Sequence, residues 1–122
     1  MDANEKVYDL EERTSIFAER IRDYCLRLPK NDANLQYIPQ LIRSGSSPAA
    51  NYIEANETIG DKDFLVKAKT CRRESKEAAY WLRLTITDGT KEMEGERKWL
   101  RQEATELKLI FNSIIKKREG NN

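Results

Sequence analysis

Two pairs of glutamates are the residues of this sequence whose type and spacing come closest to catalytic chemistry. Glu54 and Glu57 stand three residues apart, as do Glu74 and Glu77, so each pair shares one face if its segment is helical. Paired carboxylates can divide the roles of general acid and general base when their surroundings separate their pKa values. Ion pairing with arginines and lysines of neighbouring helices is the favoured interpretation, and a carboxylate-dependent enzyme is the distant alternative.

Arg43, Asn51 and Glu54 form a second candidate group, around the segment Ser-Gly-Ser-Ser-Pro at 44–48. A buried charged or amide side chain needs a hydrogen-bonding partner, because burial without one costs free energy. We therefore expect a polar network that fixes the register of the helices, with hydrogen bonds to other helices or to the serine-rich segment. A ligand pocket is the alternative interpretation.

The sequence contains no histidine, which excludes Ser-His and Cys-His nucleophilic catalysis, histidine general bases and most zinc sites. The di-iron carboxylate bundles are excluded as well, since they need a Glu-x-x-His pair on each of two helices. Gly45 stands alone among serines, without the Gly-Lys-Ser/Thr of a phosphate-binding loop. Cys25 and Cys71 form no CxxC pair, and we expect both to be buried and reduced. The sequence thus predicts a protein that is not an enzyme and has no cofactor or metal.

Apolar residues recur at alternating steps of three and four along four segments, which is the spacing of one buried stripe per helix. The segments predict helices over about 9–28, 32–59, 61–87 and 91–117, with Asp9, Asp61 and Thr90 as N-terminal caps. The serine-rich segment predicts a kink or a short break in the second helix, near Ser44–Pro48. Short connections force neighbouring helices to run antiparallel, so residues 1–122 are expected to form one all-α, up-down-up-down four-helix bundle.

The centres of the stripes identify the core. Six residues are expected to be almost fully buried there: Phe17, Ile21, Leu41, Leu82, Leu107 and Phe111. In the second helix, Leu35 and Ile42 are expected to share the apolar face of Leu41. Several apolar residues stay outside the stripes of the third and fourth helices, and we expect them to form an oligomer interface. They are Tyr80, Trp81, Leu84, Trp99, Ile110 and Ile115. Stacking of the aromatic members on nucleic-acid bases is the alternative.

The formal net charge is only +1, but the C-terminal half of the chain is moderately basic. Ordinary solvated helix faces are the favoured interpretation, and contact with RNA or another nucleic acid is the alternative. The candidate contacts are Lys67, Lys69, Arg72, Arg73 and Lys76. No stretch is apolar enough to span a membrane, and Met1–Asp9 lacks the apolar core of a signal peptide, so we expect a cytoplasmic location.

Three stretches of the sequence, in order, resemble a known family. They are Asp9-Leu10-x-x-Arg13-Thr14-x-x-Phe17-Ala18, Gln40-Leu41-x-Arg43-Ser44-x-x-Ser47-Pro48-x-Ala50-Asn51-x-x-Glu54-Ala55, and Lys69-x-x-x-x-Glu74-Ser75-x-Glu77-x-x-Tyr80-Trp81-Leu82. Together they are similar to the bacterial 23S rRNA-intervening sequence proteins, over about residues 7–116. That resemblance implies a small four-helix bundle without established enzymatic activity, assembled as a ring of five.

The same resemblance implies a more distant relation to the accessory proteins of diversity-generating retroelements. Those are basic pentamers that work with a reverse transcriptase and nucleic acid, and this chain is less basic than that role suggests. The favoured hypothesis is therefore a non-enzymatic oligomeric bundle that acts through protein or RNA interaction. A nucleic-acid-binding accessory factor is the alternative.

Overall fold

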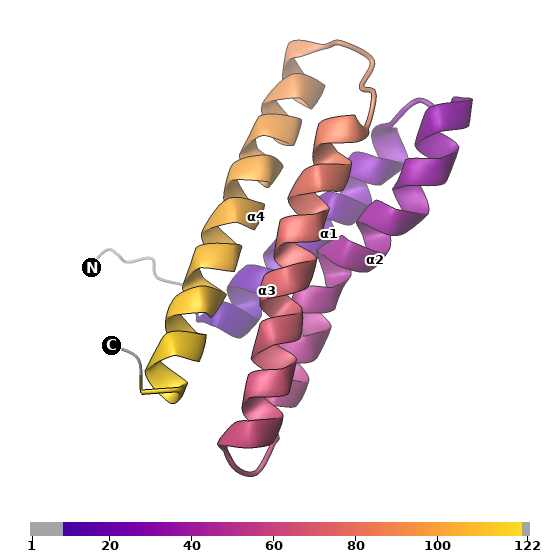
Figure 1. The fold of residues 1–122 in the computed structure, drawn as a ribbon. Coiled ribbons are helices and arrows are strands. Elements are labelled where there is room, and N and C mark those ends of the chain that lie inside the picture. The colour runs from indigo at the N-terminus through magenta and orange to yellow at the C-terminus, as the bar shows by residue number, and fades with distance from the viewer. Residues whose placement is uncertain (1–8, 121–122) are drawn as a thin grey trace.

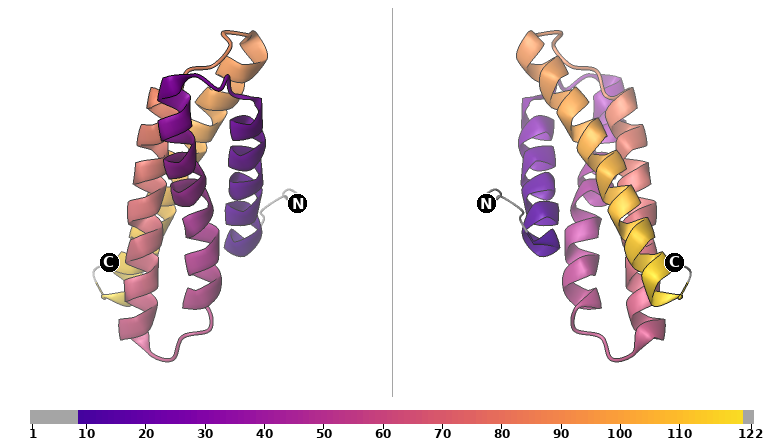
Figure 2. Two further views of the ribbon diagram at one scale, coloured as in Figure 1. Left: turned by 90° about the vertical axis from the view of Figure 1, so that its right-hand side faces the viewer. Right: turned by 90° about the vertical axis from the view of Figure 1, so that its left-hand side faces the viewer.

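The computed structural model describes residues 9–120, which form four α-helices joined by short connections (Figure 1). They are α1 (Leu10–Arg27), α2 (Asp32–Ala55), α3 (Asp61–Leu84) and α4 (Lys91–Arg118). Contacts join α1 with α2, α2 with α3, α3 with α4 and α4 with α1, so the helices enclose one core. Figure 2 shows from two sides that successive helices run antiparallel. The predicted all-α four-helix bundle is confirmed.

No helix within residues 9–120 combines the length and the apolar character needed to cross a membrane. Residues 1–8, on which the expectation about a signal peptide mainly rests, lie outside the described part of the chain.

Two of the three predicted N-terminal caps are confirmed. Asp9 Oδ1 accepts a hydrogen bond of 2.8 Å from the backbone N–H of Glu12, and Thr90 Oγ1 accepts one of 3.2 Å from Met93. The third prediction is wrong, because Asp61 is already the first helical residue of α3. Gly60 precedes it at φ 86°, a left-handed conformation that suits glycine, and supplies no side-chain cap.

Helix α3 ends at Leu84, earlier than predicted, because a side chain of α2 forms hydrogen bonds with the backbone of Ile86. Asn34, fully buried at the start of α2, donates from Nδ2 to the carbonyl of Ile86 at 2.8 Å. Its Oδ1 accepts from the N–H of the same residue at 3.0 Å. This pairing holds Ile86 outside the helix and half exposed, although the helix predicted over 61–87 included it. Helix α2 likewise ends early, at Ala55.

The serine-rich segment does not break α2, which is one helix from Asp32 to Ala55. The hydroxyl of Ser44 donates to the carbonyl of Gln40 at 2.9 Å, and that of Ser46 donates to Ile42 at 2.6 Å. Hydroxyls that bond back to the preceding turn keep serines inside a helix instead of capping a new one. Pro48 lacks an N–H and so leaves one turn without its usual hydrogen bond, which the helix tolerates here.

The six predicted core residues are confirmed, each with at most 1% of its surface exposed. The expected inner face of α2 is only partly right. Leu41 is buried, but Leu35 and Ile42 are 52% and 42% exposed. Small residues occupy the face of α2 that is buried beside Leu41, namely Ser44 and Gly45. They let neighbouring helices approach closely, and this rotates Leu35 and Ile42 outward.

Candidate functional site

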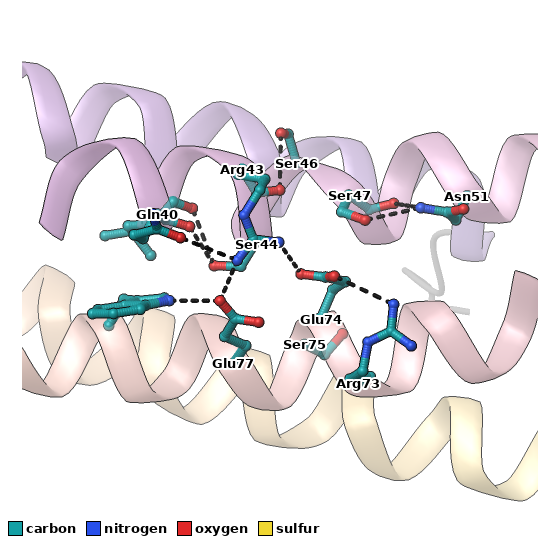
Figure 3. Close-up of polar contacts among 12 residues, drawn as sticks. Gln40, Arg43, Ser44, Ser46, Ser47, Asn51, Arg73, Glu74, Ser75 and Glu77 are labelled. Carbon is teal, nitrogen blue, oxygen red and sulfur yellow. Dashed lines mark hydrogen bonds and ion pairs between the residues drawn. The ribbon is translucent and has the colours of Figure 1, made fainter.

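The carboxylate pair of α3 is held by one guanidinium from α2 (Figure 3). Arg43 Nη1 donates to Glu74 Oε1 at 2.7 Å, and Nη2 donates to Glu77 Oε2. The same Glu77 oxygen accepts from the indole N–H of Trp81 at 2.8 Å. Glu74 is nearly buried, with 10% of its side chain exposed. A carboxylate pair satisfied in this way links two helices, which agrees with the favoured interpretation of ion pairing.

Arg43, Asn51 and Glu54 each form the predicted hydrogen bonds to another helix or to the serine-rich segment, but the three do not form one shared network. Asn51 donates from Nδ2 to the hydroxyl and the carbonyl of Ser47, at 2.8 and 3.0 Å (Figure 3). Glu54 is largely exposed and accepts from Lys67 Nζ of α3 at 2.6 Å. The structure thus separates the group into three local interactions. Within residues 9–120, no three cysteine or acidic side chains converge where they could hold a metal ion.

Most of the candidate nucleic-acid contacts are neutralised by carboxylates. Lys67, Lys69 and Arg73 pair with Glu54, Glu119 and Glu74 respectively. Arg72 differs, because its partner is the neutral amide oxygen of Asn112 on α4, at 2.8 Å. Lys76 has no ion pair or hydrogen bond within the described part of the chain. These five residues therefore do not form one free basic face, and only Arg72 and Lys76 keep an uncompensated charge.

The candidate interface residues lie on opposite sides of the bundle. Tyr80 is exposed and contacts Trp81, which also lies against Tyr37 of α2. Trp99 of α4 faces α1 instead, where the guanidinium of Arg20 stacks 3.6 Å from its ring centroid. Ile115 must be removed from the predicted interface, because it is 2% exposed inside the monomer core. Leu84 and Ile110 are partly buried.

A ladder of ion pairs, not expected from the sequence, joins α1 to α4. Arg13, Arg20 and Arg27 recur at every seventh residue on the side of α1 that faces α4. Their carboxylate partners on α4 are Glu103 and Glu106 for Arg13, Glu96 for Arg20, and Glu92 for Arg27. The hydrogen bonds and charge of Arg27 lower the pKa of Glu92 below its ordinary value. The seven-residue spacing of the arginines was the sequence signal that could have revealed the ladder.

An open groove of about 550 Å³ runs between α3 and α4, and we call it the α3–α4 groove. Its walls are formed by Ala79 of α3 and by Glu94, Arg97, Lys98, Arg101, Gln102 and Thr105 of α4. At one end, Arg97 Nη1 donates to the carbonyls of Leu82 and Thr85 at 3.3 and 2.6 Å, and Nη2 pairs with Glu94. Arg97 therefore caps the free carbonyls at the C-terminus of α3.

A search of solved structures connects this fold with a known family. A protein of unknown function from the S23 ribosomal protein family of Bacteroides thetaiotaomicron matches with a TM-score of 0.74. Its sequence is 30% identical, and the match covers 87% of this chain and 97% of that one. No protein-family model and no curated protein matches this sequence.

Proposed function

We propose that this chain, which belongs to the S23 ribosomal protein family, is a non-catalytic bundle that assembles with copies of itself and acts by interaction. The match to that family confirms the resemblance to 23S rRNA-intervening sequence proteins drawn from the sequence motifs. The matched protein is itself of unknown function, so the proposal is built on the surface of this chain. The observation that carries it is the exposed apolar surface on two separate faces.

The first apolar face lies along α2. Leu35, Ile42 and Ile53 are 52%, 42% and 46% exposed. Ile42 follows Leu35 by seven positions, about two helical turns, and Ile53 follows Ile42 by eleven, about three turns. The three side chains therefore form one stripe along the helix. The second face lies on α3, where Val66 and Tyr80 are 58% and 52% exposed and are fourteen residues apart, about four turns. Burial of such surface in a complex stabilises it by roughly 25 cal/mol for each Å² of apolar area.

Two different apolar faces on one subunit suit a head-to-tail contact. In such a contact the α2 stripe of one subunit packs against the α3 face of the next, and repetition either closes into a ring or continues as a filament. A closed ring leaves no apolar face uncovered, so we propose a closed homo-oligomer. The family resemblance implies five subunits; the surface alone does not fix the number.

A non-catalytic role is supported by the ion pairs that the candidate carboxylates form with neighbouring helices. Glu74 and Glu77 are bound by Arg43, and Glu54 pairs with Lys67. A carboxylate whose oxygens are bound by a cation of a neighbouring helix is used in a contact between helices. With no histidine in the sequence, these glutamates were the strongest candidates for acid–base chemistry.

Light scattering on purified variants tests the proposed contact. Substitution of Ile42→Asp together with Ile53→Asp places two charges on the α2 stripe, and we expect the mass to fall toward that of the monomer. Leu109→Asp is the matched control, because Leu109 is 55% exposed on α4, away from both faces, and should leave the mass unchanged. Circular dichroism shows whether each variant remains helical. A folded double variant with the full oligomer mass would contradict the assignment of the α2 stripe.

A further inference from the structure

We propose that the α3–α4 groove binds the phosphate backbone of a nucleic acid. This inference names a partner class for the interaction role proposed above and rests on it. Of the contacts selected from the sequence it keeps Arg72 and Lys76 and drops the three that are paired with carboxylates.

Besides Arg97 and Lys98 of the wall, five cations flank the α3–α4 groove along its length. On α3, Lys76 and Arg83 stand three residues before and four residues after Ala79, so they lie on the same side of the helix. Arg72 lies one turn further back and reaches across to Asn112 of α4. Arg101 forms part of the wall, and Lys108 follows one turn after Thr105.

The charge of these cations is not compensated within the described residues. Lys76, Arg83, Arg101 and Lys108 have no ion pair there, and Arg72 contacts only an amide. The one carboxylate in the wall, Glu94, is already used by Arg97 and Thr87. Like charges along one groove repel each other, and a bound polyanion would relieve that repulsion.

The side of α4 that faces α1 differs from the groove side, because its charges are paired. Toward α1, α4 presents Glu92, Glu96, Glu103 and Glu106, and each is matched by an arginine of the ladder. Toward α3, Arg97 pairs with Glu94 and Arg118 pairs with Asp61, whereas Lys98, Arg101 and Lys108 have no ion pair within the described residues. The fold therefore neutralises the glutamates on the side of α4 that faces α1 and leaves Lys98, Arg101 and Lys108 on the other side available to a partner.

The chemistry of the groove favours a phosphate backbone over an acidic protein. Protein interfaces usually depend on buried aromatic or large apolar anchors, and the residues of the groove wall include only one apolar side chain, that of Ala79. Guanidinium and ammonium groups spaced along a line suit successive phosphates, and phosphate contacts carry no sequence information. We therefore expect binding without preference for sequence, and binding of both RNA and DNA, because both carry the same phosphate groups.

Fluorescence anisotropy with a labelled single-stranded RNA and the DNA of the same sequence tests the proposal. Both should bind, and raising the salt from about 50 to about 200 mM should weaken binding with a log–log slope of roughly −3, as expected for four or five neutralised phosphates. Arg101→Glu and Lys108→Glu should each weaken binding about tenfold and make the slope shallower. Arg101→Gln serves if a charge reversal impairs folding, and it should produce a smaller loss in the same direction.

Lys62→Glu is the control, since it changes the net charge equally at an exposed site near the first turn of α3, far along the helix from Ala79. It should leave affinity and slope unchanged. Three results would overturn the proposal: no binding at low salt, equal weakening by Lys62→Glu and Arg101→Glu, or equally tight binding of a polyglutamate peptide. Light scattering on the same samples separates the two proposals, because a wild-type oligomer that binds neither RNA nor DNA contradicts only the groove.

Discussion

Ile21 of α1 packs directly against the backbone of α2 at Gly45. A Cβ atom placed on Gly45 would lie 2.8 Å from Ile21 Cγ2 and 2.9 Å from Cγ1, well inside van der Waals contact. Ile21 is 1% exposed and lies in the main core, so it has little room to move. The glycine in the segment that predicted a kink or break of the second helix is instead a position where α1 packs directly against the backbone of α2.

This contact makes Gly45→Ala destabilising, although alanine is the better helix former. Overpacking of a core costs about 1–3 kcal/mol, against a gain of roughly 1 kcal/mol in helix propensity. Gly95→Ala is the matched control, because no atom lies within 4 Å of a Cβ placed there in α4. Urea unfolding should show a lower free energy of unfolding for Gly45→Ala and a higher one for Gly95→Ala. An increase of the same size in both variants would show that the contact has no energetic weight.

Removal of a large core side chain should have a greater effect. Phe17 and Phe111 are both fully buried in the main core. Truncation of either to alanine should lower the free energy of unfolding by about 3–5 kcal/mol, through lost burial and the cavity that remains. Leu109→Ala, on the exposed surface of α4, should change it by less than about 0.5 kcal/mol. An unchanged thermal midpoint in Phe17→Ala would contradict the core described above.

The ion-pair ladder predicts a specific dependence of stability on pH. Hydrogen bonding and charge from Arg27 lower the pKa of Glu92 from 4.5. A carboxylate with a lowered pKa stabilises the fold above its unfolded pKa and loses that contribution as the pH falls through its folded pKa. Glu92→Gln should therefore have a lower thermal midpoint than the wild type at neutral pH, and the difference should shrink below about pH 4. A difference that stays constant from pH 7 to pH 3 would show that the pair contributes no pH-dependent stability.

The two cysteines should be unreactive in the native state. Burial raises the pKa of Cys25 and of Cys71 to about 12, so almost no thiolate forms at pH 8. An aromatic disulfide reagent should label neither thiol in the folded protein and both in urea. Rapid labelling of one thiol without urea would indicate local opening of the core at that cysteine.

Much of the fold could be predicted because its signals are local. The stripes that contain Phe17 and Phe111, and the caps at Asp9 and Thr90, depend on residues within one or two turns of each other. The errors arose where a distant residue decides the outcome. The end of α3 is set by Asn34, fifty-two residues away from Ile86.

The candidate site was harder to predict, because the partner of a charged side chain is a tertiary property. The sequence identified Glu74 and Glu77 as a pair and Arg43 as a residue in need of a partner, but it could not show that they bind one another. Equally, Lys67 and Lys76 look alike in the sequence. Only the packing of α2 against α3 places Glu54 beside Lys67 and leaves Lys76 on the α3–α4 groove.

The mass of the wild-type protein in solution tests the central claim most directly. Light scattering or sedimentation equilibrium at tens of micromolar should give one fixed multiple of the 14.2 kDa chain, unchanged on dilution over a tenfold range. Five subunits is the number that the family resemblance implies, and a dimer or tetramer would contradict that number alone. A mass of 14.2 kDa throughout would contradict the proposal that the exposed faces of α2 and α3 are covered by copies of the same chain.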